Sequence, residues 1–278
     1  MLARKTKRDR QREHDESLPV PEILPSSISV EVADARSLPW DWESVNLLVT
    51  SPPYGIMDGD DGIRKYRTPD DWRAWGELMD DFALESYRVL ADGGRVALNV
   101  PYDTWVGGEQ GGQRSTLARA HLAFTAAGFT YVTLISWDEG NISKSIARGS
   151  VDSPSAPRVI NRQEALLVFC KGQYGRLAQA KSHGLTSDIT HEEWLEWTSG
   201  VWTIPGESHP WEGFAAAFPV ELARRLIKLF SFREDTIADP FAGSGTVGVA
   251  ALKLGRKALL SDIDPLQVQS AKRRLLAR

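Results

Sequence analysis

Eight residues near the C-terminus have the types and spacing needed to hold a small ligand against the main chain. They read Asp239-Pro-Phe-Ala-Gly-Ser-Gly-Thr246, after the apolar run 236–238 and before the helix-forming run 247–254. A strand, a glycine turn and a helix in this order offer unpaired helix N–H groups. Gly243 and Gly245 permit a tight turn and a close approach of the ligand. The stretch predicts a ligand cradle, although many doubly wound proteins have such a turn without a ligand.

Two further carboxylates follow predicted strands. The run 255–262 reads as a strand ending in Asp262, which is placed to accept hydrogen bonds from ribose hydroxyls. The run 28–32 alternates with period two and leads to Asp34-Ala35, where a carboxylate would meet an adenine amino group. Residues of these types suit a ligand that contains a nucleoside.

A second stretch with chemical potential is Ser51-Pro-Pro-Tyr54, directly after the apolar strand 45–49. Two prolines end the strand ladder and leave carbonyl oxygens as acceptors. The Ser51 hydroxyl and the Pro52 carbonyl would accept the hydrogens of an exocyclic amine, while Tyr54 stacks on its planar base. The nitrogen lone pair would then attack an electrophilic carbon. Taken alone, a Ser-Pro-Pro sequence is usually only a turn.

The elements that must position these residues form an α/β pattern. Seven strands are expected, interleaved with helices, at 28–32, 45–49, 95–100, 129–137, 164–170, 236–238 and 255–262. Such a pattern predicts a mostly parallel, doubly wound sheet with both faces covered. Ligands of these sheets bind beyond the carboxyl ends of the strands. We therefore expect Asp34, Ser51, Asp239 and Asp262 to converge there.

The connecting segments are less regular. An amphipathic helix begins at Asp70, and its Trp72 and Trp75 are expected to pack in the core rather than stack on bases. Ser115 or Thr116 is expected to cap the next helix. The glycine-rich loop 101–114 is expected to move as a lid. The segment 171–208 has no clear period.

Composition narrows the class of protein. The chain has 278 residues, of which 42% are hydrophobic and 25% charged, as in ordinary soluble globular enzymes. No apolar run approaches the roughly 18 residues that span a bilayer, so we expect no membrane association. The single cysteine, Cys170, fits a reducing cytoplasm and sits within a predicted strand as a core residue. A net charge of −4 excludes a uniformly basic surface but leaves room for a local basic face.

Residues 1–27 are expected to form a flexible basic arm. Six of the first twelve residues are lysine or arginine, and acidic residues and three prolines follow. This arm is either a solvated tail or a segment that contacts phosphates on DNA.

Together, the two stretches resemble the S-adenosylmethionine-dependent amino DNA methyltransferases of the β group, in which the order of motifs is circularly permuted. Thr50 to Tyr54 resembles the catalytic motif, and Asp239 to Thr246 resembles the cofactor loop. His209-Pro-Trp and Ala217-Phe-Pro219 are similar to the family's cofactor-flanking segment, with an insertion between the two halves. The resemblance covers about Ile28 to Leu276 and implies a Rossmann-like methyltransferase domain over 28–278.

The resemblance implies a complete set of roles. Serine at the start of the tetrapeptide goes mostly with N4-cytosine methylation in this family. The implied substrate is double-stranded DNA from which the target cytosine is flipped, and no metal is required. The implied catalytic residues are Ser51, Pro52, Pro53 and Tyr54. The implied S-adenosylmethionine-binding residues are Asp34, Ala35, Phe218, Asp239, Pro240, Phe241, Gly243, Ser244, Gly245, Thr246 and Asp262.

The other expectations concern recognition and partners. A target-recognition insertion is expected around 171–208, together with the loop 138–160; a purely structural insertion is the alternative. The implied location is the cytoplasm, in association with the nucleoid. A homodimer and a cognate restriction endonuclease acting on the same site are left open.

Three rival functions remain. An adenine-N6 DNA methyltransferase of the same fold is the nearest, because a hydroxyl can serve either amine. Enzymes that methylate RNA bases or protein amides use related tetrapeptides, and a DNA-binding scaffold with an inactive fold is the last rival. Cytosine-C5 methylation is disfavoured, because it needs a cysteine nucleophile and Cys170 is expected in the core.

Overall fold

The computed structural model describes residues 24–53, 65–66, 69–107, 112–140, 150, 152–157, 159, 161–206 and 218–277. Most of the expected basic arm lies outside these residues, as do Tyr54, His209 and Ala217. In the described part, no helix is long and apolar enough to cross a membrane.

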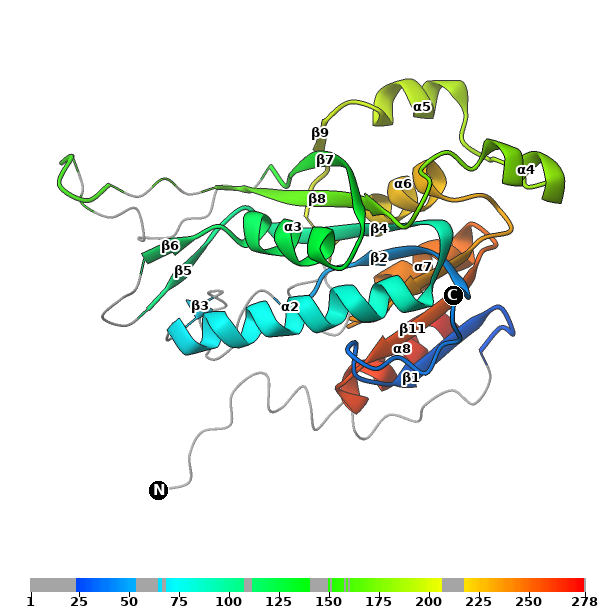
Figure 1. Ribbon diagram of the computed structural model, residues 1–278, viewed down its shortest axis with the longest axis horizontal. Coiled ribbons are helices and arrows are strands. Elements are labelled where there is room, and N and C mark those ends of the chain that lie inside the picture. The colour runs from blue at the N-terminus through cyan, green and yellow to red at the C-terminus, as the bar shows by residue number, and fades with distance from the viewer. Residues whose placement is uncertain are drawn as a thin grey trace.

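Within these residues, one sheet of eight strands forms the centre of the molecule (Figure 1). In spatial order its strands are β1 (Ile28–Val32), β11 (Lys257–Asp262), β10 (Thr236–Asp239), β2 (Val45–Thr50), β4 (Leu90–Pro101), β8 (Gln163–Cys170), β7 (Thr130–Asp138) and β9 (Val201–Thr203). Neighbours from β1 to β4 are parallel, and β9 is parallel to β7. Only β8 runs antiparallel to both of its neighbours. The predicted mostly parallel sheet is confirmed.

The eighth strand, β9, was not among the seven expected. It has three residues, of which only Trp202 is buried, so it is too short to show a period in the sequence. A second sheet, of three short strands, joins β3 (Lys65–Tyr66), β5 (Thr104–Val106) and β6 (Gly112–Arg114). Part of the segment 101–114, expected to be a lid loop, is thus a β-hairpin.

Helices cover both faces of the main sheet. The helices of the described residues are α2 (Pro69–Val89), α3 (Thr116–Ala126), α4 (Leu177–His183), α5 (His191–Trp197), α6 (Val220–Phe230), α7 (Thr246–Lys253) and α8 (Pro265–Leu276). On β2, Leu47 packs in the core beneath α6, α7 and α8, whereas Leu48 packs in the core beneath α2 and α3. Successive strand residues point to opposite faces, so this alternation makes the sheet doubly wound.

The helix ends follow local rules. Ser115 is the N-cap of α3 and accepts a hydrogen bond from the Ala118 N–H, which settles the choice between Ser115 and Thr116. Trp75, which lies on α2, is buried in the core, as expected, and Trp72 on the same helix is partly buried against that core.

The described part of the segment 171–208 runs from the amino ends of the parallel strands, the amino edge of the sheet, to their carboxyl ends, the carboxyl edge. It begins where β8 ends, at Cys170, which pairs with Arg95 near the start of the parallel strands. A buried ion pair of 2.7 Å between Arg176 and Asp235 fastens it there, and Asp188 bonds Arg256 at 2.7 Å. The segment reaches the carboxyl edge only at Thr203, which pairs with Asp138. Helix α4 therefore lies at the amino edge, on the right in Figure 1.

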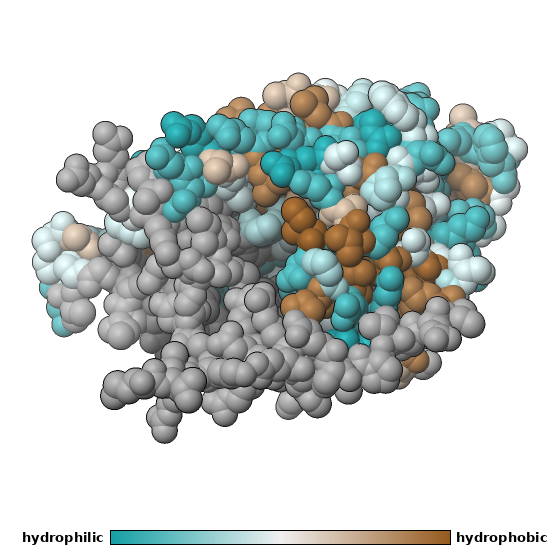
Figure 2. Space-filling model, turned by 90° about the horizontal axis from the view of Figure 1, so that it is seen from below, coloured by the Kyte–Doolittle hydropathy of each residue, from teal (hydrophilic) through white to brown (hydrophobic). Residues whose placement is uncertain are grey.

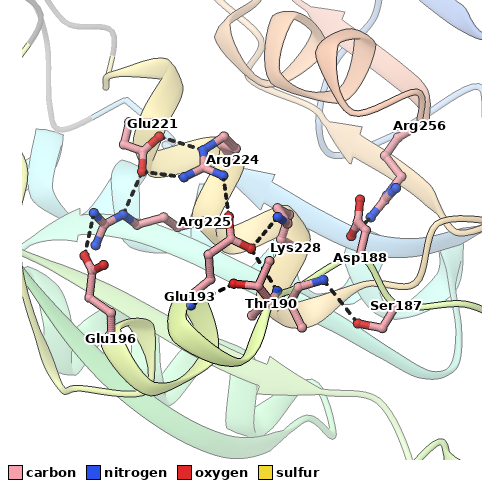
Figure 3. Close-up of polar contacts among 11 residues, drawn as sticks. Ser187, Asp188, Thr190, Glu193, Glu196, Glu221, Arg224, Arg225, Lys228 and Arg256 are labelled. Atoms are coloured by element: carbon pink, nitrogen blue, oxygen red, sulfur yellow. Dashed lines mark hydrogen bonds and ion pairs between the residues drawn. The ribbon is translucent and has the colours of Figure 1, made fainter.

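Helix α5 is held against α6 by charged groups (Figure 3). Glu193 bonds Arg224 at 2.9 Å and also pairs with Lys228. Glu196 pairs with Arg225 at 3.0 Å. The guanidinium groups of Arg224 and Arg225 also lie over the ring of buried Trp197, at 4.8 and 5.3 Å. Although burial opposes ionisation, the hydrogen bonds from Lys228, the Thr190 N–H and Arg224 lower the pKa of Glu193 to about 2.

Candidate active site at the carboxyl edge of the sheet

The carboxyl ends of four adjacent parallel strands meet at one edge. Strands β1, β11, β10 and β2 are consecutive in the sheet, and Val32 pairs with Asp262. Ala238 pairs with Leu48, so Asp239 and Ser51 leave neighbouring strands within one or two residues of each other. The convergence expected for Asp34, Ser51, Asp239 and Asp262 is therefore present.

One buried hydrogen bond joins the two turns. The Thr50 hydroxyl donates to Asp239 Oδ1 at 2.6 Å, and both residues are almost inaccessible to solvent. The Phe241 N–H donates to the same oxygen at 3.1 Å. A single carboxylate oxygen thus binds the serine turn and the glycine turn, although Thr50 and Asp239 are 189 positions apart.

Burial changes the acidity of this carboxylate. The loss of hydration raises the pKa of Asp239 to about 7, against the opposing effect of the hydrogen bonds from Thr50 and Phe241. The nearby Asp262 carboxylate adds a smaller effect in the same direction.

The glycine turn has the conformation that its sequence predicts. Gly243 has a φ of +51°, and the nearest atom to a Cβ added there, Gln267 Oε1, would lie 3.9 Å away. Its N–H donates to Asp262 Oδ2 at 2.9 Å. Gly245 has a φ of +78°, and a Cβ there would come within 3.0 Å of the Ala271 Cβ on α8. Gly243 is needed for its backbone conformation, and Gly245 is needed both for conformation and for close packing.

The hydroxyls of Ser244 and Thr246 face an arginine in the protein interior. Arg274 on α8 donates to Ser244 Oγ at 2.9 Å and to Thr246 Oγ1 at 3.0 Å. Its side chain is buried, so the turn is held from beneath by a charged group. The sequence analysis missed this role. The helical period offered a signal, since Arg274 lies three residues after the core residue Ala271, on the same face of α8.

Asp262 is half-buried and oriented by the main chain. Its Oδ1 accepts the Asp264 N–H at 3.0 Å, while its Oδ2 accepts Gly243. Burial raises its pKa, against the effect of these bonds. Beside it, Val32 and Ile263 expose apolar side chains. Figure 2 looks onto the side of the molecule where β1 lies and shows hydrophobic residues gathered on that face among hydrophilic ones.

The other predicted cofactor residues differ in burial and in the groups that they contact. The Asp34 carboxylate binds the Arg36 guanidinium, with a shortest distance of 2.6 Å, and this hydrogen bond lowers the pKa of Asp34. Ala35, Phe218 and Pro240 are buried, so their side chains serve packing. Phe241 is half-buried and meets Phe82 edge to face, with the ring centroids 5.0 Å apart.

The serine turn is anchored from α2. Trp75 Nε1 donates to the Pro53 carbonyl at 2.7 Å. Pro52 is buried, Ser51 is half-buried and Pro53 is exposed. Sequence reasoning placed Trp75 in the core but missed this hydrogen bond. Tyr54 lies outside the described residues.

Two alternative chemistries find no support at this edge. Among the described residues, no group of three or more His, Cys, Asp or Glu side chains is arranged to hold a metal ion. Cys170 is fully buried at the opposite edge of the sheet, and burial raises the pKa of its thiol. The expectation of a core cysteine is confirmed.

Residues 45–273 match the N6/N4 DNA methylase family. The chain belongs to this family of DNA methylases. It is similar to the Type II methyltransferase M.MjaI of Methanocaldococcus jannaschii, with 30% identity over 248 residues, covering 80% of this chain and 82% of the relative. M.MjaVI of the same organism is 38% identical over 169 residues, covering 60% and 79%.

A solved structure supports the fold of this DNA methylase. The Thermus thermophilus protein TTHA0409, described as a candidate DNA modification methylase and solved in complex with S-adenosyl-L-methionine, superposes with a TM-score of 0.68. The two proteins are 28% identical, and the match covers 89% of this DNA methylase and 93% of that chain.

Proposed function

We propose that this DNA methylase transfers a methyl group from S-adenosylmethionine to the exocyclic N4 amine of a cytosine flipped out of double-stranded DNA. The observation that carries the proposal is the bond between Thr50 and Asp239, which places the serine turn beside the glycine turn. In this account the two turns hold the methyl acceptor and the methyl donor, in the permuted order in which the acceptor motif comes first along the chain.

The residues of the glycine turn fit a nucleoside-containing cofactor. Each oxygen of the half-buried Asp262 carboxylate accepts one N–H, which leaves lone pairs for ribose hydroxyls. Val32 and Ile263 offer apolar contact to an adenine ring. Gly243 leaves the main chain open to close approach. S-adenosylmethionine, when bound there, supplies an electrophilic methyl group on a sulfonium centre.

The fit refines the roles of several predicted cofactor residues. Since Ser244 and Thr246 turn their hydroxyls to Arg274, any contact they make with the cofactor would come from backbone groups. The same holds for the buried Ala35 and Pro240. Asp34 would reach the adenine amino group with a carboxylate already oriented by Arg36.

The serine turn supplies acceptors for the amine. The Ser51 hydroxyl and the Pro52 carbonyl take its two hydrogens, and Tyr54 stacks on the base. The nitrogen lone pair is thereby drawn out of conjugation with the ring and forms the new N–C bond. The pair of the broken C–S bond stays on sulfur, and one amine proton passes to water. The base must leave the duplex for its amine to reach this edge.

The surface that reads the DNA sequence belongs, in our proposal, to the carboxyl edge. From the predicted segment 171–208, we assign to this surface the part from β9 onward, because Thr203 pairs with Asp138 at the carboxyl edge. Helix α4 of the same segment lies at the amino edge. The loop 138–160 leaves β7 at the carboxyl edge and completes the surface. Because the relatives M.MjaI and M.MjaVI are named Type II methyltransferases, we extend the proposal to a cognate restriction endonuclease. We also propose that the protein acts at the nucleoid, where its substrate lies.

The product distinguishes this function from its rivals. The protein is incubated with S-adenosylmethionine and unmethylated DNA of mixed sequence, and the digested nucleosides are identified by mass. We expect N4-methylcytosine, with at least a hundredfold loss in Ser51→Ala, which removes one acceptor. Detection of N6-methyladenine would instead identify the protein as an adenine-N6 methyltransferase, and methylation of RNA but not DNA would overturn the proposal.

A further inference from the structure

We propose that Thr50 and Trp75 are positioning residues that fix the serine turn at a set distance from the glycine turn. The inference rests on the proposed function and adds two residues that are not among the implied catalytic and cofactor-binding residues. Each makes one hydrogen bond at one end of the turn Ser51–Pro53: Thr50 at its start and Trp75 at its finish.

The bond from Thr50 replaces the sheet ladder at the point where the ladder stops. The last paired residues of β10 and β2 are Ala238 and Leu48. Beyond them the two chains part, one into the glycine turn and the other into the serine turn. The bond of 2.6 Å between Thr50 and Asp239 is a lateral link beyond this point. Because both residues are buried, water does not compete for the bond.

The acceptor of this bond is itself part of the glycine turn. Asp239 Oδ1 also accepts the Phe241 N–H, and Phe241 lies two residues before Gly243. A change in the position of Thr50 therefore reaches the cofactor turn through one atom.

Trp75 fixes the other end of the serine turn. The Pro53 carbonyl that it binds belongs to the peptide bond leading to Tyr54. The indole is itself confined by its surroundings, because it is buried and stacks on Trp72 with the ring centroids 5.2 Å apart. Proline at position 53 restricts φ, and the bond from Trp75 restricts the orientation of the next peptide plane. The turn is held at both ends by rigid groups.

This arrangement matters because methyl transfer depends on alignment. Reacting atoms must approach to roughly 3–3.5 Å, and a displacement of about 1 Å lowers the rate by roughly a hundredfold. Residues that set the separation of the two turns should therefore act on turnover more than on cofactor affinity.

The first test uses Thr50→Val, which keeps the shape of the side chain but removes its donor. In single-turnover methylation with saturating S-adenosylmethionine and DNA, we expect the rate to fall by about ten- to a hundredfold. The dissociation constant of the cofactor should change less than about threefold. Thr50→Ser keeps the hydroxyl and should restore most of the rate.

A matched control separates positioning from packing. Thr116 is also fully buried, and its hydroxyl bonds to no group in the part of the chain that the structure describes. Thr116→Val should therefore leave the rate unchanged. A further readout needs no cofactor: in the free protein, hydrogen exchange of the Phe241 amide should be faster in Thr50→Val than in Thr50→Ser.

The second test uses Trp75→Phe, which keeps an aromatic ring but removes the indole N–H. We expect a similar loss of turnover with near-normal cofactor affinity. Trp40→Phe is the control, because Trp40 is buried and donates to Glu31 at 3.2 Å rather than to the serine turn.

The outcomes separate this inference from the proposed function. If the wild-type protein methylates DNA but Thr50→Val and Trp75→Phe retain the parental rate, the inference is wrong and the function stands. If Thr50→Ser fails as badly as Thr50→Val, the hydroxyl is not what matters and the inference is also wrong. A wild-type protein without methylation activity would overturn the function first, and unaltered Phe241 exchange would then overturn the link as well.

Discussion

At the scale of single residues, Asp239 combines two demands that normally conflict. Its carboxylate is buried beneath both turns, where an ionised group is costly, yet it must accept hydrogen bonds from Thr50 and Phe241. The result is a carboxyl group whose pKa rises to about 7. Since both donors use Oδ1, an amide oxygen in the same place would accept both bonds without an ionisable proton.

Asp239→Asn should therefore change how stability depends on pH. The folded-state pKa of Asp239 lies above its ordinary value of 3.8, so between these values the folded protein holds a proton that the unfolded chain releases. Stability from this group is lost as pH rises toward 7. The free energy of unfolding of Asp239→Asn, measured in urea relative to that of the wild type, should therefore rise by about 2–3 kcal/mol from pH 5 to pH 8.

The control for this experiment is Asp41→Asn, at an exposed turn. The difference in the free energy of unfolding between Asp41→Asn and the wild type should stay constant over the same pH range. If the free energies of unfolding of Asp239→Asn and the wild type changed with pH in parallel, Asp239 would not be a buried group that titrates in this range.

At the scale of elements, the sequence predicts regular segments well and short ones poorly. The runs 28–32 and 164–170 appear as β1 and most of β8, because periodic or continuous apolar residues mark them. In contrast, β9, β5 and β6 have three residues each, and α4 and α5 have seven. Seven residues hold less than two turns of a helix, and three residues hold less than two periods of a strand. The formation of these short elements therefore depends on what they pack against.

The candidate site also has features that the sequence predicts and features that only the fold reveals. The positions of the glycine and serine turns could be predicted because each turn consists of adjacent residues that follow a recognisable strand. The bonds from Thr50, Trp75 and Arg274 could not, since each joins groups that only the fold brings together.

Helix α5 shows what such packing contributes, and Glu193→Gln tests it. The substitution keeps the capping contact to the Thr190 N–H but removes the charge that pairs with Arg224 and Lys228. Because hydrogen bonds hold the folded-state pKa of Glu193 near 2, below its ordinary 4.5, the stability from this group is present above pH 4.5 and is lost as pH falls toward 2.

We expect Glu193→Gln to lower the free energy of unfolding by about 1–2 kcal/mol at pH 7, after allowance for solvent screening of the partly exposed pair. The neighbouring exposed Glu192→Gln should cost less than about 0.5 kcal/mol. Equal losses in the two variants, measured by urea unfolding, would show that the pairing of α5 with α6 contributes little.

At the scale of the whole molecule, the candidate site is built from strands that are distant in sequence but adjacent in space. Strands β10 and β11 come last in the chain, yet they lie between β1 and β2, which come first. This order brings the serine turn, the glycine turn and Asp262 to one edge. The segment 171–208 instead spans the sheet from the amino edge to the carboxyl edge, so much of it serves to brace the fold.

A crystal structure of the protein with S-adenosylmethionine tests the central claim most directly. We predict that the ribose hydroxyls bind the Asp262 carboxylate and that the sulfonium methyl points toward the Ser51–Pro53 turn, within reach of a base amine. A cofactor bound away from the Asp239–Thr246 turn, or one whose methyl faces away from Ser51, would contradict the account.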